Sequence, residues 1–155
     1  MSRSILKPML VGLMLASSAA AWAGNDGQDR ASDLISTDKD YRAAWAKAIK
    51  SQERLPEWVI NLSGYSPPMS ATTEDGDKYL VGQVCEKQEA CKNNQIIVAF
   101  DWDKSHAYAL WVQVPAGLPE DKSPTRHADY RWLGEPDKGM QEMLKEQLRK
   151  DPNWY

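Results

Sequence analysis

The residues best suited to chemistry in this chain lie in one short segment bounded by its only two cysteines, Cys85-Glu86-Lys87-Gln88-Glu89-Ala90-Cys91. In an oxidising compartment, two cysteines this close in sequence are expected to bond to each other. Closing so short a loop contributes about 2 to 3 kcal/mol in the chain-entropy model, and it reduces the entropy that the loop loses on entering a cleft. The segment is therefore either a preformed binding loop or a staple that only fixes a hairpin. In the first case the binding residues are Glu86, Lys87, Gln88, Glu89 and Ala90.

Other residue types that could support catalysis lack the partners that catalysis needs. A redox-active cysteine pair favours a two-residue spacing near a helix start, and a zinc site needs more ligands. The two histidines, His106 and His127, fall in polar connections, where histidine is usually a solvated surface residue. The sequence contains no phosphate-binding glycine loop, nucleophile elbow or metal motif. It therefore predicts a protein that is not an enzyme and that uses no metal or cofactor.

Residues 1–23 have the pattern of a cleavable signal peptide. Arg3 and Lys7 precede an apolar run over residues 8–21, and Ala21-Trp22-Ala23 supplies the small residues that a signal peptidase recognises. The run is shorter than the roughly 20 apolar residues of a membrane span, and a polar segment follows it directly. We therefore expect a protein that is exported from the cytoplasm, has no membrane anchor and begins at Gly24 when mature.

Charge and length indicate what the mature chain can bind and how it is organised. Loss of the two basic residues in the leader changes the formal net charge from −3 to −5. This acidity disfavours nucleic acid and anionic lipid headgroups and favours a cationic protein partner. Residues 24–36 are polar and lack periodicity, so they are predicted to be a flexible lead-in. Residues 37–155 are then expected to form a single domain.

The periodicity of apolar residues predicts an α+β fold. Thr37 or Asp38 can cap a first helix, and a short helical turn is expected at residues 55–59. Asp75-Gly76 marks a hairpin between strands at 69–73 and 78–84. Alternating patterns predict further strands at 96–102, 108–114 and 130–133, with one buried face made by Ile96, Val98, Phe100 and Trp102 and another by Tyr108, Leu110, Val112 and Val114. A second helix around residues 140–148 ends before Pro152.

The order of these elements is helix, strand meander, helix, which predicts an antiparallel sheet flanked by an N-terminal and a C-terminal helix. The first helix would bury Tyr41, Ala44, Trp45, Ala48 and Ile49, and the last would bury Met140, Met143, Leu144 and Leu148.

A resemblance to a known family rests on the leader, the segment Leu55-Pro56-Glu57-Trp58-Val59, the hairpin into 79–84, the Cys85–Cys91 loop and the strand at 96–102. With these features the chain resembles the Ivy family, inhibitors of vertebrate (C-type) lysozyme. The similarity extends from about residue 37 to the C-terminus. It implies an Ivy-like fold with a central antiparallel sheet, location in the periplasm of a Gram-negative bacterium, and a rigid loop that enters the lysozyme cleft. Family members can also form homodimers.

In the family, loop side chains hydrogen-bond the catalytic carboxylates of lysozyme, and the typical loop reads Cys-Lys-Pro-His-Asp-Cys. The loop of this chain is one residue longer, lacks histidine and proline, and has Glu86 where the family has lysine. The resemblance then implies Lys87 as the charged donor and Gln88 as the neutral donor, with Glu86 and Glu89 facing basic residues at the rim.

Because two carboxylates repel acidic loop residues more than one does, an endogenous lytic transglycosylase with a single catalytic glutamate is an alternative target. A third hypothesis is that the protein is a diverged periplasmic binding module without inhibitory activity.

Overall fold

The computed structural model describes residues 29–152 and 154. The predicted signal peptide and the first part of the predicted lead-in lie outside these residues. The helices are α1 (Ala31–Thr37), α2 (Lys39–Ile49), α3 (Glu57–Ile60), α4 (Pro124–His127) and α5 (Lys138–Arg149), with a 3₁₀ turn, η1, at Gln88–Ala90. The strands are β1 (Ser70–Glu74), β2 (Asp77–Cys85), β3 (Asn94–Asp101), β4 (Ala107–Gln113) and β5 (Asp129–Leu133). Within the described residues, no helix is both long and apolar enough to cross a membrane.

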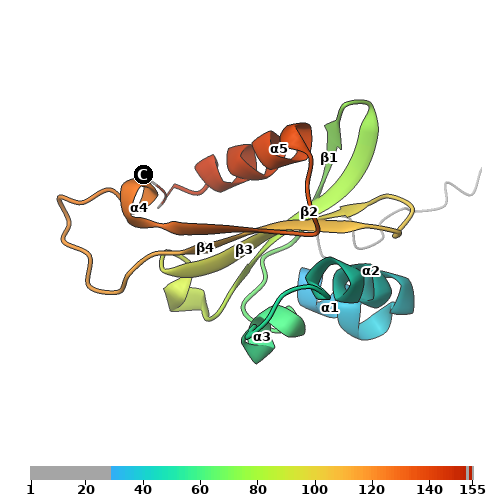
Figure 1. Cartoon of the computed structure of the whole chain (residues 1–155), viewed down its shortest axis with the longest axis horizontal. Coiled ribbons are helices and arrows are strands. Elements are labelled where there is room, and N and C mark those ends of the chain that lie inside the picture. Colours follow the sequence, from blue (N-terminus) through green and yellow to red (C-terminus); the bar gives the residue numbers. More distant parts are fainter. Residues whose placement is uncertain (1–28, 153, 155) are drawn as a thin grey trace, which may run out of the picture.

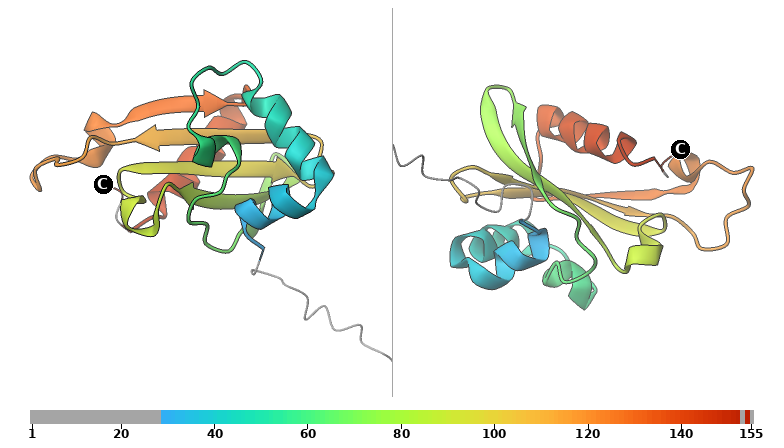
Figure 2. Two further views of the ribbon diagram at one scale, coloured as in Figure 1. Left: turned by 90° about the horizontal axis from the view of Figure 1, so that it is seen from below. Right: turned by 180° about the vertical axis from the view of Figure 1, so that it is seen from behind.

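The five strands form one antiparallel sheet in the order β1-β2-β3-β4-β5, in which each strand pairs with its neighbour in sequence. The helices α1, α2 and α3 cover one face, and α5 covers the other (Figures 1 and 2). This arrangement confirms the predicted α+β fold, an antiparallel meander flanked by helices. Its hairpins bring residues that are far apart in sequence to the same end of the sheet.

Each face of the sheet has its own hydrophobic core. Successive residues of a strand point to opposite faces, so β3 supplies both cores. The core beneath α1 to α3 contains Ile96, Val98 and Phe100, and the core beneath α5 contains Ile97 and Ala99. Because β3 is buried on both faces, it is a rigid base for the connections at its two ends.

The predicted N-terminal helix is confirmed as α2, and its cap is Asp38, whose side chain accepts a hydrogen bond from the backbone N–H of Asp40. Within the described residues, helical structure nevertheless begins earlier than the sequence predicts. Residues 31–37 form helix α1 instead of belonging to a flexible lead-in, and Ala31 and Ile35 are buried in the core. The backbone N–H of Ala31 donates to Ser66 Oγ at 3.1 Å. This long-range contact fixes a segment that has too few apolar residues for its periodicity to be recognised.

The prediction that Trp102 belongs to the buried face of β3 is wrong. β3 ends at Asp101, and Trp102 lies in the following turn with 55% of its surface exposed. The Lys78 ammonium lies 3.8 Å from the centroid of the Trp102 ring, so the ring makes a cation–π contact at the surface instead of packing in the core.

Glu74, the last residue of β1, is expected to lower the stability of the fold at neutral pH. Partial burial raises the pKa of Glu74 above its ordinary value of 4.5, and the negative charges of Asp137, Asp75 and Asp77 raise it further. Protonated Glu74 therefore favours the folded state, and this contribution is lost as the pH rises through the folded-state pKa. We expect Glu74→Gln to raise the free energy of unfolding at neutral pH by up to about 0.5 kcal/mol.

Urea unfolding of both proteins at neutral pH and at about pH 3.5, below the ordinary pKa of 4.5, measures this effect. The gain should shrink at the lower pH, where Glu74 is protonated in the folded and the unfolded state. An equal gain at both pH values would show that the ionisation of Glu74 is not its cause.

Candidate functional site

The disulfide-closed loop lies at the turn between β2 and β3. Cys85 and Cys91 are bonded, with their Cα atoms 4.8 Å apart, which confirms the predicted pairing. Cys85 is the last residue of β2, and η1 forms within the closed segment. The loop projects from one end of the sheet, close to the long connection between β4 and β5 (Figure 2). The bond thus closes a short segment at the tip of a hairpin whose strands belong to the centre of the sheet.

Backbone hydrogen bonds hold the base of the loop on both sides. The N–H of Cys85 donates to the carbonyl of Tyr65 at 2.8 Å, and the N–H of Glu86 donates to the carbonyl of Asn94 at 3.2 Å. Gly64, next to Tyr65, permits the first of these contacts, because a Cβ atom at this position would lie 1.9 Å from the carbonyl oxygen of Cys85. The segment before β1 therefore packs directly against the residue where the loop begins.

The interior of the loop is also hydrogen-bonded. The N–H of Ala90 donates to the carbonyl of Lys87 at 3.0 Å, and the N–H of Asn93 donates to the carbonyl of Ala90 at 2.9 Å. The carbonyl of Asn93 in turn accepts from the N–H of Val114 at 2.8 Å, just beyond β4. With its backbone groups paired to one another and to the sheet, the loop has a defined shape before it meets any partner.

The acidic side chain at the start of the loop is turned toward the sheet. Glu86 Oε2 accepts a hydrogen bond from Asn94 Nδ2 at 3.3 Å, and Asn94 Oδ1 accepts from the indole N–H of Trp111 at 2.8 Å. This chain of contacts orients Glu86 away from the tip, which Lys87, Gln88 and Glu89 occupy. Of the predicted binding residues, Glu86, Lys87, Gln88 and Glu89 are exposed, whereas Ala90 is half-buried.

Asn94 and Trp111 support the loop, although the sequence pattern does not indicate this role for them. Both lie on strands, and only the register of β3 and β4 brings them together beside Glu86. No local sequence signal marks this contact, because it depends on how two strands pair.

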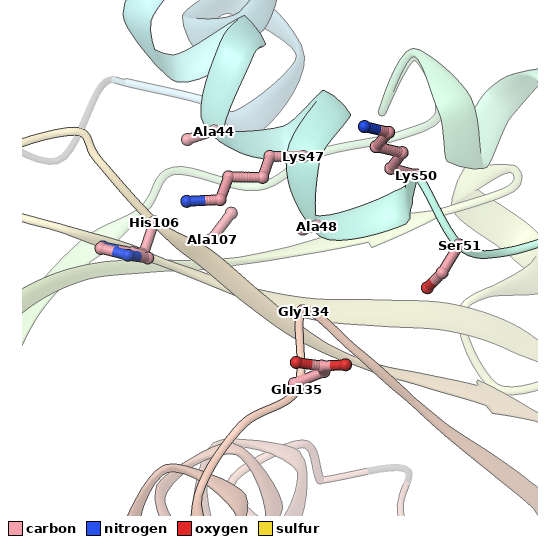
Figure 3. Close-up of a pocket in the computed structure, with 9 residues that line it drawn as sticks. All are labelled: Ala44, Lys47, Ala48, Lys50, Ser51, His106, Ala107, Gly134 and Glu135. Carbon is pink, nitrogen blue, oxygen red and sulfur yellow. The ribbon is translucent and has the colours of Figure 1, made fainter.

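His106 lies in the β3–β4 turn at the opposite end of the sheet, at the edge of a cavity of about 420 Å³ that Lys47 and Glu135 also line (Figure 3). Ser105 Oγ and Asp101 Oδ2 approach the same ring nitrogen, His106 Nδ1, at 2.8 and 2.9 Å. A catalytic triad needs serine and aspartate on different nitrogens of the histidine. The three residues therefore form a turn-stabilising cluster instead of a nucleophilic site.

Asp101 is the centre of this cluster. Although partial burial opposes its ionisation, hydrogen bonds from the backbone N–H of His106 and the hydroxyl of Ser105 lower the pKa of Asp101. The second histidine, His127, is exposed and contacts the carbonyl of Ser123 at 2.9 Å. Among residues 29–152 and 154, no group of three or more His, Cys, Asp or Glu side chains is arranged to hold a metal ion.

The fold and the loop define a disulfide-stapled α+β protein, and comparison with known proteins places it in a family. The family model described as inhibitor of vertebrate lysozyme (Ivy) matches residues 40–150. A Pseudomonas aeruginosa protein named inhibitor of vertebrate lysozyme is 36% identical over 148 residues, which cover 94% of this chain and 95% of that protein. The chain therefore belongs to the Ivy family.

Two further relatives carry no functional name. An uncharacterised protein of Pseudomonas aeruginosa is 54% identical over 153 residues, covering 99% of this chain and 97% of that protein. An uncharacterised protein of Yersinia pestis is 43% identical over 115 residues, covering 74% of this chain and 73% of that protein.

Proposed function

We propose that this protein is a periplasmic inhibitor of C-type lysozyme and that loop 85–91 enters the active-site cleft of the enzyme. The observation that carries this proposal is the loop itself. It is covalently closed, hydrogen-bonded at its base, and exposes the side chains of Lys87, Gln88 and Glu89. A segment that is already ordered loses little conformational entropy on binding, so a small contact area can give tight binding.

The loop offers two donors for the catalytic carboxylates of the enzyme. The Lys87 ammonium can make a charge-assisted hydrogen bond, which is stronger than a neutral one in a desolvated cleft, and the Gln88 amide can donate beside it. The hydrogen bond from Asn94 directs the Glu86 carboxylate toward the sheet and away from the loop tip. Glu89 is exposed and is placed to face basic groups at the rim of the cleft. The acidic mature chain also favours encounter with a basic enzyme.

Lys87→Ala is expected to weaken inhibition of a C-type lysozyme about tenfold and Gln88→Ala about threefold, because one loses a charge-assisted and the other a neutral hydrogen bond. Titration of each variant against lysozyme, with peptidoglycan cleavage as the readout, measures the effect. Lys39→Ala is the matched control, since it removes the same charge from an exposed position on α2. If Lys39→Ala weakens inhibition as much as Lys87→Ala, overall charge and not the loop controls binding.

A lytic transglycosylase is the second candidate target. Lys87 is the only cation in the closed segment, and a single cation matches the one catalytic glutamate of such an enzyme better than two carboxylates. Parallel titrations against a transglycosylase and a lysozyme distinguish the two targets. If only the transglycosylase is inhibited, it and not lysozyme is the target, and the proposed role of the loop still holds. If neither enzyme is inhibited, the result favours the third hypothesis, a binding module without inhibitory activity.

A further inference from the structure

A second cavity lies on the α5 face of β5, separate from the loop. It encloses about 700 Å³ between β5, the last turn of α5 and Trp154, a volume within the usual range of small-molecule sites. Its walls are aromatic, and its charged groups are Lys145 and Arg149. No acidic side chain is among the described residues that line it.

The aromatic rings of this cavity are held in fixed positions. Tyr130 and Trp132 are two residues apart on β5 and therefore point to the same face. The rings of Tyr130 and Trp154 have centroids 6.2 Å apart and are nearly perpendicular, at 83°. The phenol of Tyr130 donates to the carbonyl of Thr125 at 2.9 Å, which fixes the ring while 43% of the residue stays exposed. A ligand would meet preformed ring faces.

The two cations stand on one side of this aromatic surface. Lys145 and Arg149 are four residues apart on α5 and so project in similar directions. Lys145 Nζ lies 5.9 Å from the centroid of the Trp132 ring and 3.4 Å from Glu142, in an exposed ion pair of little strength. Arg149 is exposed in the last turn of the helix. A ligand carboxylate can reach both cations at little cost.

We propose that this cavity binds a saccharide that carries a carboxylate. The apolar C–H face of a pyranose ring packs on aromatic rings, and its carboxylate pairs with Lys145 and Arg149. The combination of aromatic ring faces with two cations, and with no acidic side chain among the described lining residues, favours an anionic sugar over a neutral one.

The source of such a saccharide follows from the proposed function, on which this step rests. Bacterial wall glycan contains muramic acid, whose lactyl group ends in a carboxylate once the peptide stem is removed. β5 begins opposite the end of β4, and β4 ends opposite the start of β3, so the start of β5 lies at the end of the sheet that carries loop 85–91 (Figure 1). Because Tyr130 near the start of β5 lines the cavity, the cavity lies toward this end. A glycan held there would keep the inhibitor beside the polymer that its target cleaves.

The test is a titration of the ¹⁵N-labelled mature protein with two disaccharides, monitored through the tryptophan indole N–H signals. One is N-acetylglucosaminyl-N-acetylmuramic acid, and the neutral match is di-N-acetylchitobiose. We expect the signals of Trp132 and Trp154 to shift and the acidic disaccharide to bind about fivefold more tightly. Trp132→Phe and Trp154→Phe assign the two signals.

Variants of the rim separate the cations from the rings. The double variant Lys145→Gln, Arg149→Gln should reduce the affinity for the acidic disaccharide to that for the neutral one. Lys138→Gln, at the other end of α5, should leave the affinities for both disaccharides unchanged. Equal binding of the two disaccharides by the wild-type protein, or no shift of the Trp132 and Trp154 signals, overturns the proposal.

The assay contains no lysozyme, so its result is independent of inhibition. Lys87→Ala, which impairs the proposed inhibitory loop, should bind the acidic disaccharide as the wild type does. Saccharide binding without lysozyme inhibition would refute only the proposed function, and inhibition without saccharide binding would refute only this second site.

Discussion

Replacing both Cys85 and Cys91 with alanine is expected to weaken inhibition of lysozyme roughly 30- to 150-fold, which corresponds to about 2 to 3 kcal/mol of loop-closure free energy. Without the bond, the hydrogen bonds to Tyr65 and Asn94 still hold the base of the loop, but η1 and the tip residues sample other conformations. The loop must then become ordered during binding. Inhibition constants measured for the wild type and the double variant give the difference directly.

Chemical reduction is the control for this substitution. Dithiothreitol should weaken inhibition by the wild-type protein to a similar extent and leave the double variant unchanged. Circular dichroism at the assay temperature establishes that both proteins are folded. If oxidised and reduced wild-type protein inhibit equally well, the closed loop is not the inhibitory element, and another surface of the molecule must make the contact.

Trp45→Ala is expected to lower the free energy of unfolding by about 3 to 5 kcal/mol, the range for truncating a large buried aromatic side chain. Trp45 on α2 is 1% exposed, and its indole N–H donates to the carbonyls of Val59 and Ile60, both at 3.0 Å. The substitution leaves a cavity beneath α2 and removes the donor that ties α3 to it. Urea unfolding followed by circular dichroism measures the loss.

Two other substitutions show which property of Trp45 matters. Trp45→Phe keeps an aromatic ring but not the donor, so it should cost about 1 to 3 kcal/mol. Trp102→Ala, at the exposed tryptophan that contacts Lys78, should cost less than about 1 kcal/mol. A loss for Trp45→Ala no larger than that for Trp102→Ala would contradict the assignment of Trp45 to the core.

The sheet and the two main helices could be predicted because each has a strong local signal. Alternation at Ile96, Val98 and Phe100 indicates a strand, and Asp75-Gly76 indicates the hairpin before it. The same reasoning failed where local pattern and tertiary structure diverge. Alternation continues to Trp102, but the strand ends one residue earlier, since the chain turns there to form the β3–β4 connection.

Helix α1 could not be predicted because long-range contacts stabilise it. Ala31 donates to Ser66, and Met69 donates to the carbonyl of Asp29 at 2.7 Å, yet neither pairing has a local signature. In the candidate site, too, some features have a local sequence signal and others depend on long-range contacts. The spacing of Cys85 and Cys91 predicts the closed loop, whereas the contact of Glu86 with Asn94 depends on strand pairing.

The most direct test of the inhibitory mechanism is competition between this protein and an active-site ligand of lysozyme. The affinity of the oxidised mature protein for a C-type lysozyme is measured by calorimetry, with and without saturating tri-N-acetylchitotriose, which occupies the cleft. If loop 85–91 enters the cleft, the saccharide must weaken binding of the wild-type protein, and Lys87→Ala must bind more weakly even without saccharide. Unchanged affinity in the presence of the saccharide would show that the two proteins associate outside the cleft and would contradict inhibition by occlusion.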